Sequence, residues 1–303
     1  MLDLRIFALT PSEAHNMPAH TNENHDASND YSKTVLAAFE LLQMFDAETT
    51  ELGIRELSRK LGKPKSSVSR LVSTLNYLGV LEQDPVTEKY HIGFKLLELG
   101  SLWLQNVPLR DRIHRYLSKL VDETQETAYL AILSRDNTAI YIDKVQSPQA
   151  VRVGSPVGRA VPLRDSAIGR ALLAYLPAEQ QKQIIQTCKP VKQTPNTICD
   201  PAELEQFLAL SVKRGYFLDD EEIEIGLRCV AVPILRDDGS PIASVCTSGP
   251  STRITLERVP DIAHTVQRIA AEASKELTHL EKHDGILLYG SAGARRQKCP
   301  GRS

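Results

Sequence analysis

Basic and hydroxyl side chains gather in one short stretch of this 303-residue chain. Between Arg55 and Arg70 lie six lysines and arginines, against a single acid, Glu56. Serines stand among and after them, at positions 66, 67, 69 and 73. Lysine, arginine and serine bind phosphate oxygens, and arginine and serine also read the edges of bases. The local clustering predicts a nucleic-acid surface, because the net charge of the whole chain, -2, shows no general basic excess.

The residues expected to contact the nucleic acid all carry a cation or a hydroxyl. They are Arg55, Lys63, Lys65, Ser66, Ser67, Ser69, Arg70, Ser73 and, further along the chain, Lys89. The solvated face of an ordinary helix would show similar charges and hydroxyls. The secondary structure predicted around this stretch is therefore needed to distinguish a binding surface from a merely solvated one.

Three helices and a hairpin are expected to position these side chains. Apolar residues recur there at helical spacing, and two short β-rich runs follow, joined by turn residues. The helices are expected at Tyr31–Phe45, 54–61 and 64–78, and the strands at Val80–Gln83 and Lys89–Ile92. Three helices followed by such a hairpin are typical of a winged helix-turn-helix, in which the third helix enters the major groove of DNA.

A second group of polar side chains occurs late in the chain. Cys229 opens an apolar run, Cys246 and Ser248 lie in the next one, and an acidic stretch begins at Asp219 just upstream. Thiol, hydroxyl and carboxylate groups on paired strands, faced by the small residues Ser166–Gly169, could frame a small polar pocket. The alternative is packing alone, since a cysteine in an apolar strand is commonly a small buried hydrophobe. The acidic stretch would then be a solvated turn, and the serine would bond to backbone.

The rest of the chain predicts an α+β fold, with a linker helix and then helices packed on one antiparallel sheet. Strands are expected at Thr127–Leu133, Thr138–Val145, Ala150–Val153, Cys229–Leu235 and Ile242–Thr247, and helices at 94–104, 111–124, 165–175, 178–187, 201–214 and 255–280. The expected parts are a flexible extension (1–29), a winged helix-turn-helix domain (30–93), a linker helix (94–108), a second domain (109–281) and a flexible tail (282–303).

Five segments carry a resemblance to a known family. In the first half they read LGKPKSSVSRLVSTLNYLGVLEQD and EKYHIG. In the second half they read PLRDSAIGRALLAYLP, TPNTICDPAELEQFLALSVKRGYFLDDEEIEIGLRCVAVPI and SGPSTRIT. Together, in this order and at this spacing, they resemble the IclR family of bacterial transcription regulators, from about residue 31 to about residue 280.

The resemblance implies an N-terminal winged helix-turn-helix, a linker helix and a C-terminal, GAF-like domain that binds an effector. It also implies a dimer or tetramer on a palindromic double-stranded DNA operator, with dimerisation through the N-terminal domain and the linker helix. A small organic acid or aromatic catabolite would control operator affinity, and the regulator would be a repressor or an activator. By similarity, the effector site comprises Ala150, Ala167, Ile168, Asp219, Leu227, Cys229, Cys246 and Ser248.

The sequence departs from the family at two places near this site. The segment Pro162–Asp165 precedes the small-residue helix where the family often has a histidine, and Cys246 stands where serine is frequent. We add Arg164 to the expected effector site, because a guanidinium pairs with a carboxylate through two parallel hydrogen bonds. The same arginine could equally pair with Asp165 or another nearby acid.

Other function classes find less support in the sequence. No G-x-S-x-G, P-loop, G-x-G-x-x-G or H-E-x-x-H occurs, so we expect no enzyme and no catalytic residues. The five cysteines form no C-x-x-C pair and no common zinc spacing, so no metal or cofactor is expected, although a metal or thiol-redox sensing regulator remains the alternative. No stretch of about 18 apolar residues and no signal peptide is evident, so we expect a cytoplasmic protein without a membrane partner.

Overall fold

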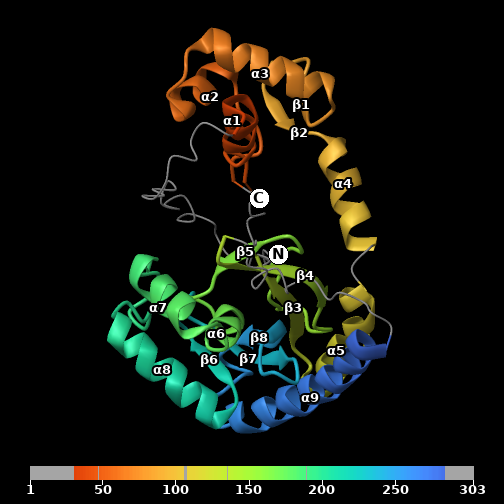
Figure 1. The fold of residues 1–303 in the computed structure, drawn as a ribbon, viewed down its shortest axis with the longest axis vertical. Coiled ribbons are helices and arrows are strands. Elements are labelled where there is room, and N and C mark those ends of the chain that lie inside the picture. The colour runs from red at the N-terminus through yellow and green to blue at the C-terminus, as the bar shows by residue number, and fades with distance from the viewer. Residues whose placement is uncertain (1–30, 47, 106–107, 135, 189, 284–303) are drawn as a thin grey trace, which may run out of the picture. The chain divides into compact units, whose positions relative to one another are not determined.

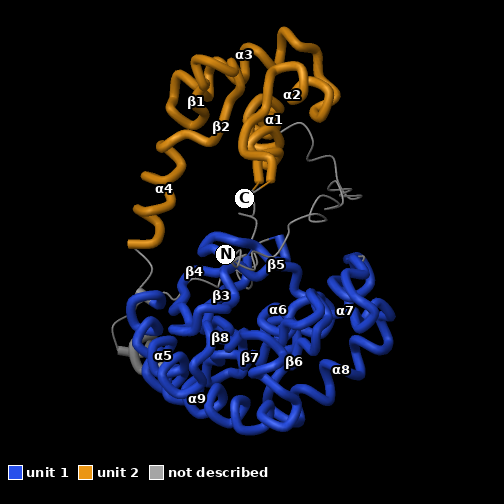
Figure 2. Tube along the Cα trace, turned by 180° about the vertical axis from the view of Figure 1, so that it is seen from behind, with its two compact units in different colours: residues 1–9, 107–303 blue, residues 10–106 orange. Residues whose placement is uncertain are grey.

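The structure is a computed structural model of the protein, and it describes residues 31–46, 48–105, 108–134, 136–188 and 190–283. These residues form two compact units, which Figure 2 colours separately. The N-terminal unit comprises the described residues up to 105, and the C-terminal unit those from 108 onward. The two expected flexible segments lie outside the described residues, except that the last helix includes residues 282 and 283.

The N-terminal unit is built from three short helices, a two-stranded hairpin and a fourth helix. Its elements are α1 (Lys33–Leu42), α2 (Ile54–Leu61), α3 (Lys65–Tyr77), β1 (Leu81–Gln83), β2 (Tyr90–Ile92) and α4 (Phe94–Gln105) (Figure 1). The first helix is shorter than the expected Tyr31–Phe45, because Ser32 already caps its N-terminus. Leu41, Leu57 and Leu81 are fully buried and join α1, α2 and the hairpin in one core.

Two glycines join the hairpin to its neighbouring helices. Gly79 follows α3 with a φ of 69°, a left-handed conformation that suits glycine. Gly93 lies directly against it: a Cβ on Gly93 would be 2.2 Å from the carbonyl oxygen of Gly79. The backbone N–H of Gly93 donates to the carbonyl of Val80 at 2.9 Å, which holds the two segments together. This close approach fixes where α4 begins.

The C-terminal unit is a six-stranded antiparallel sheet with helices on both faces. Its elements are α5 (Pro108–Thr124), β3 (Thr127–Leu133), β4 (Thr138–Val145), β5 (Ala160–Pro162), α6 (Ala167–Leu173), α7 (Ala178–Thr187), α8 (Pro201–Arg214), β6 (Phe217–Asp220), β7 (Leu227–Leu235), β8 (Pro241–Pro250) and α9 (Val259–His283). The strand order is β5-β4-β3-β8-β7-β6, and every pairing is antiparallel. The first and last helices of the unit come together beneath the sheet (Figure 1).

Two hydrophobic cores lie on opposite faces of this sheet. On one face α5 and α9 cover the strands, with Leu117 and Val266 fully buried. On the other face α6 packs on β6, β7 and β8, while α8 packs on β6 and α7 on α8. Leu172 and Leu208 are buried in this second core. Within the described residues, no helix is both long and apolar enough to cross a membrane.

The expected strand at Ala150–Val153 is absent, and this prediction was wrong. The segment is irregular, and the carbonyl oxygen of Val153 accepts hydrogen bonds from side chains: the hydroxyls of Thr127 at 3.3 Å and Tyr129 at 3.2 Å. Side chains thus supply the partners that a neighbouring strand would have offered. The edge strand forms later instead, where Ala160–Pro162 pairs with β4.

The acidic stretch is also not a solvated turn. Residues 217–220 form strand β6, in which Phe217 and Asp219 are buried while the two residues between and after them are partly exposed. Because side chains alternate along a strand, burying the phenylalanine carries the aspartate to the same face. Glu222 is buried as well, and it forms an ion pair with the buried Arg170.

The contact between Gly93 and Gly79 leads to a stability prediction. Gly93→Ala should destabilise the N-terminal unit by about 1–3 kcal/mol, because the added methyl group forces the hairpin away from α3. Gly100→Ala is the control: a Cβ there would meet nothing within 4 Å, and alanine favours the helix. Urea unfolding followed by the fluorescence of Trp103, the only tryptophan, reports on this unit. Equal midpoints for both variants would contradict the steric argument.

Candidate functional site

The turn between α2 and α3 aims the third helix. Gly62 ends α2 in the left-handed conformation, with a φ of 61°. The hydroxyl of Ser58 then donates to the carbonyl oxygen of Lys63 at 2.7 Å, which ties the turn to the preceding helix. Pro64 occupies the N-cap position of α3, a residue whose fixed φ suits a helix start. The turn is therefore determined by local backbone chemistry.

Helix α3 has a buried face and a polar exposed face. Val68, Val72 and Leu75 point into the core of the N-terminal unit. Of the nine residues expected to contact nucleic acid, the following are exposed: Arg55, Lys65, Ser66, Ser67, Arg70, Ser73 and Lys89. Lys63 and Ser69 are half-buried, and the ammonium of Lys63 lies 3.6 Å from Glu40. The structure thus places most of the set on α3 and its N-terminal turn, on the side away from the core.

The hairpin β1–β2 forms a wing next to α3. Its strands pair antiparallel, and the turn is held by Asp84, whose carboxylate accepts from the backbone N–H groups of Thr87 at 2.7 Å and Val86 at 2.8 Å. These hydrogen bonds lower the pKa of Asp84. The exposed side chain of Lys89 follows the turn, and Val86 at the tip is also exposed. The wing carries one of the expected basic contacts on a rigid turn.

In the C-terminal unit, four strands place polar side chains in one row. Antiparallel register aligns Asp219 with Cys229, Cys229 with Ser248, and Ser248 with Thr127. Residues directly opposite one another on paired strands share a face. We call these four residues the polar row. The thiol of Cys229 and the hydroxyl of Ser248 share a hydrogen bond of 2.7 Å within it.

The neighbouring positions on the same face complete the surroundings of the polar row. Two residues along from Thr127 and Ser248, Tyr129 aligns with Cys246 on the same face, and both are buried. Ala167 and Ile168 occupy the first two positions of α6, which packs over these strands and buries both side chains. The structure therefore brings together six of the expected effector-site residues: Ala167, Ile168, Asp219, Cys229, Cys246 and Ser248.

Two residues of this face were missed by sequence reasoning. Thr127 and Tyr129 lie two positions apart on β3, and both hydroxyls hold the loop that follows β4 through the carbonyl of Val153. Tyr129 also accepts from the backbone N–H of Ser155 at 3.1 Å, and its ring lies 4.8 Å from that of Tyr141. The alternation of side chains along the correctly expected strand Thr127–Leu133 was the signal that could have identified them.

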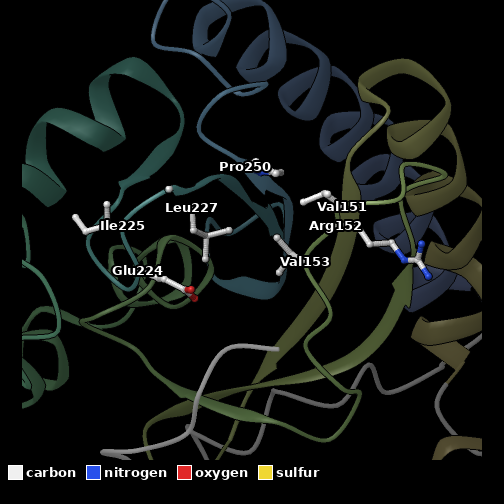
Figure 3. A pocket seen from close by; sticks show the side chains of 8 residues that line it. Val151, Arg152, Val153, Glu224, Ile225, Leu227 and Pro250 are labelled. Atoms are coloured by element: carbon white, nitrogen blue, oxygen red, sulfur yellow. The ribbon is translucent and has the colours of Figure 1, made fainter. Parts of the chain in front are cut away.

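A pocket of about 160 Å³ adjoins the polar row. It is lined by Val151, Arg152, Val153, Glu224, Ile225, Gly226, Leu227 and Pro250. Leu227 and Pro250 face each other in register, one alternation beyond Cys229 and Ser248. Figure 3 shows the side chains of Val151, Val153, Leu227 and Pro250 gathered around this pocket, while the guanidinium of Arg152 points away from it. Ala150 is exposed beside this lining.

Arg164, the cation expected at the effector site, is buried and engaged by protein groups. Its Nη1 donates to the carbonyl oxygens of Ile185 at 3.1 Å and Cys188 at 2.6 Å, and its Nη2 donates to that of Cys199 at 3.1 Å. Its Nε lies 3.4 Å from Asp165. The guanidinium therefore joins the start of α6 to the end of α7 and to the segment before α8.

Arg170 and Glu222 form a fully buried ion pair behind the polar row. The two terminal nitrogens of Arg170 lie 2.6 and 2.7 Å from the two carboxylate oxygens of Glu222. The Nε of Arg170 donates to the carbonyl of Arg164 at 2.6 Å, and Glu222 also accepts from the backbone N–H of Ile198 at 3.1 Å. The pair fastens α6 to the turn after β6, and its own polar groups are well satisfied.

Burial disfavours the charged forms of the ionisable groups in the polar row and of Cys246 beside it. Desolvation raises the pKa of Asp219 to about 7 and that of Cys246 to about 12. It raises the pKa of Cys229 well above its usual value, and the neighbouring Asp219 adds to this effect. A thiol that keeps its proton is a weak nucleophile and a poor metal ligand. Among the residues that the structure describes, no group of three or more His, Cys, Asp and Glu side chains could hold a metal ion.

The two units together define a class of protein. A helix-turn-helix with an exposed basic and hydroxyl-rich third helix, joined in one chain to a separate sheet domain, is typical of a DNA-binding transcription regulator. Residues 34–85 match the IclR helix-turn-helix domain, and residues 102–275 match the C-terminal domain of bacterial IclR transcriptional regulators. The chain belongs to the IclR family, as its sequence segments indicated.

Individual relatives agree with this assignment. The chain is 35% identical to the HTH-type transcriptional regulator KdgR of Escherichia coli, over 84% of this chain and 97% of the relative. It is 32% identical to the transcriptional repressor IclR of the same organism, over 80% of this chain and 89% of that one. The crystal structure of Thermotoga maritima IclR superposes with a TM-score of 0.62 at 32% identity, covering 81% of this chain and 98% of that one. The expected fold class is therefore confirmed.

The buried ion pair yields a second stability prediction. Glu222→Gln should destabilise the C-terminal unit by about 3–5 kcal/mol, because Arg170 is left charged and unpaired in the interior. Glu272→Gln is the control in an exposed group of ion pairs with Arg268 and Lys119, and it should lower the urea midpoint far less. Far-UV circular dichroism during urea unfolding measures both. A Glu222 variant as stable as the control would show that the pair does not hold the unit together.

Proposed function

We propose that this protein is a transcription regulator that binds operator DNA through α3 and the wing, under the control of a small molecule bound beside the polar row. The observation that carries the DNA half of the proposal is the exposed face of α3, where lysine, arginine and serine side chains replace the apolar residues of the core side. Such a face supplies phosphate contacts and base-edge donors together. The protein would act in the cytoplasm, where the DNA is.

In this proposal the N-terminal end of α3 leads into the major groove. Lys65, Ser66 and Ser67 contact the backbone phosphates near the helix start, and Arg70 reaches a base edge. The flanking contacts come from Arg55, Lys63, Ser69, Ser73 and, on the wing, Lys89. Lys63 contributes a weaker contact than its type suggests, because Glu40 lies close to its ammonium.

We propose that the protein self-associates through α1 and α4, as a dimer or a tetramer on a palindromic operator. Phe39 on α1 is 63% exposed, and Leu97 on α4 is 66% exposed. Val35 and Phe94 on the same two helices are exposed as well. Apolar residues grouped on helix surfaces are commonly covered by a partner. A second copy of the chain would cover them and would also present a second recognition helix to the operator.

The proposed effector is a small organic acid or aromatic catabolite. The site would include Ala150 and Leu227 from the rim of the pocket, together with the six residues that the sheet and α6 bring together. Arg164 is not part of the revised site, because its guanidinium already serves three backbone carbonyls. A solved IclR homologue from Microbacterium hydrocarbonoxydans, 24% identical to this chain, is a complex with 4-hydroxybenzoate, which makes that compound a reasonable first probe.

The DNA half of the proposal is tested on Arg70. Arg70→Ala should weaken binding to the operator upstream of the protein's own gene or its neighbours by about 1–3 kcal/mol, because a bidentate base contact is lost. Lys182→Ala is the control, since it removes one exposed charge from α7 in the other unit. Gel-shift titrations at one stated salt concentration measure both variants. If both bind like the unsubstituted protein, Arg70 does not read the operator.

The effector half is tested with gel shifts in a panel of organic acids that includes pyruvate and 4-hydroxybenzoate. One of them should change operator affinity in the unsubstituted protein. Ser248→Ala should then require a higher concentration of that acid, by roughly five- to tenfold, because one hydrogen bond of the polar row is lost. Operator binding without the acid should stay unchanged. An equal response from both proteins would remove Ser248 from the site.

A further inference from the structure

We propose that Asp219 is a protonated hydrogen-bond donor in the ligand-free pocket and that it selects effectors presenting an acceptor oxygen, namely monocarboxylates. The inference rests on the effector site proposed above. It adds the protonation state of Asp219 when the effector binds. The effector anion binds to the neutral carboxylic acid of Asp219, so that control of operator affinity depends on pH as well as on the effector.

The geometry of Asp219 distinguishes its two oxygens. The Oδ1 accepts a hydrogen bond from the backbone N–H of Glu222 at 2.8 Å, so its acceptor role is already in use. The Oδ2 is buried and has no hydrogen-bond partner among the described residues, and the whole residue is 1% exposed. A buried polar atom without a partner is costly. A ligand in the adjoining site would supply the missing partner.

The groups around Asp219 disfavour its ionised form, which would place a second negative charge close to Glu222. Glu222 follows it in sequence and already carries a negative charge, which Arg170 of α6 balances through both terminal nitrogens. On β7 and β8 the neighbours are the thiols of Cys229 and Cys246, which keep their protons. From α8, which also packs on β6, the buried side chains are Leu204, Leu208 and the uncharged Ser211.

Burial is the main reason that the pKa of Asp219 is raised to about 7. The backbone hydrogen bonds from Glu222 and Ile223 and the charge of Arg170 lower this pKa, whereas the negative charge of Glu222 raises it further. Around neutral pH the carboxyl therefore holds its proton in a large share of molecules. Since Oδ1 already accepts a hydrogen bond, the proton belongs on Oδ2, which is then a donor lacking an acceptor. A carboxylate oxygen of the ligand fits this position, whereas an ammonium group does not.

The pH dependence follows from this assignment. Below about pH 7 Asp219 is a donor and the ligand carboxylate is ionised, so the two are complementary. Above that pH the empty site must first take a proton from solvent, or two anions would face each other. Affinity for a monocarboxylate should therefore fall about tenfold for each further pH unit.

Isothermal titration calorimetry of the full-length protein with pyruvate and with 4-hydroxybenzoate, between about pH 6 and 8.5, tests the inference. Repeating each titration in two buffers of different ionisation enthalpy gives the number of protons taken up. We expect about one proton at pH 8 or above and few at pH 6. An affinity that does not change with pH, or one that rises with pH, would overturn the assignment of Asp219 as a donor.

Asp219→Asn is the sharpest variant, because its amide is a permanent donor of the same shape. It should bind the same acid with an affinity independent of pH and, near pH 8.5, about tenfold or more tightly than the unsubstituted protein. Asp220→Asn is the control: that carboxylate is partly exposed and pairs with Arg228, so its pH profile should match the unsubstituted protein. A weaker Asp219 variant at every pH would contradict the proposal.

A measurement without ligand checks that Asp219 keeps its proton. A carboxyl with a raised folded-state pKa stabilises most below its unfolded value, near 3.8, and loses that contribution as pH rises towards about 7. The unsubstituted protein should therefore lose stability relative to Asp219→Asn across this range in urea unfolding. A pH-independent difference overturns the inference. If neither acid binds at pH 6, the monocarboxylate site itself fails, whereas binding with a flat pH profile refutes the proton linkage alone.

Discussion

The C-terminal unit depends on the buried ion pair between Arg170 and Glu222. Taking two charges out of water is costly, and the pair is tolerable because both partners make further hydrogen bonds, to the carbonyl of Arg164 and from the N–H of Ile198. Its consequence is positional. By fastening α6 to the turn after β6, the pair fixes the N–H of Glu222 that holds Asp219, and with it one end of the polar row.

The same ion pair is one reason why the charges next to the polar row are already engaged by protein groups. Arg170 neutralises Glu222, Arg164 donates to backbone carbonyls, and the thiols of Cys229 and Cys246 keep their protons. What remains for a ligand are hydroxyl, thiol and carboxyl groups whose positions are set by sheet register. Helix α3, the proposed DNA-reading helix, differs in that its charges and hydroxyls are exposed, while a turn at Gly62 and an apolar stripe hold the helix in place.

Much of this could be predicted from the sequence, and the failures have physical causes. Helices and strands with a clear period, such as Thr127–Leu133 and Pro201–Arg214, were found at their observed bounds. The strand expected at Ala150–Val153 was wrong because the carbonyl of Val153 accepts hydrogen bonds from the side chains of Thr127 and Tyr129, which lie far away in the sequence. The sequence left open whether the acidic stretch at Asp219 belongs to a pocket or to a solvated turn, because burial of a carboxylate follows from sheet register and from the buried Phe217 two positions before it, which local composition does not show. Arg164 suited a ligand by type alone, until its partners 21 and more residues away were known.

In the proposed function, ligand bound at the polar row and operator DNA bound at α3 influence each other within one chain. Because such coupling is reciprocal, the factor by which an acid changes operator affinity must equal the factor by which operator changes affinity for the acid, typically about 5–150-fold. The direct measurement is the dissociation constant of the acid active in the gel shifts, taken with and without saturating operator DNA. We expect two constants that differ by the gel-shift factor. Identical constants would contradict this coupling, because the pocket and the DNA surface would then act independently.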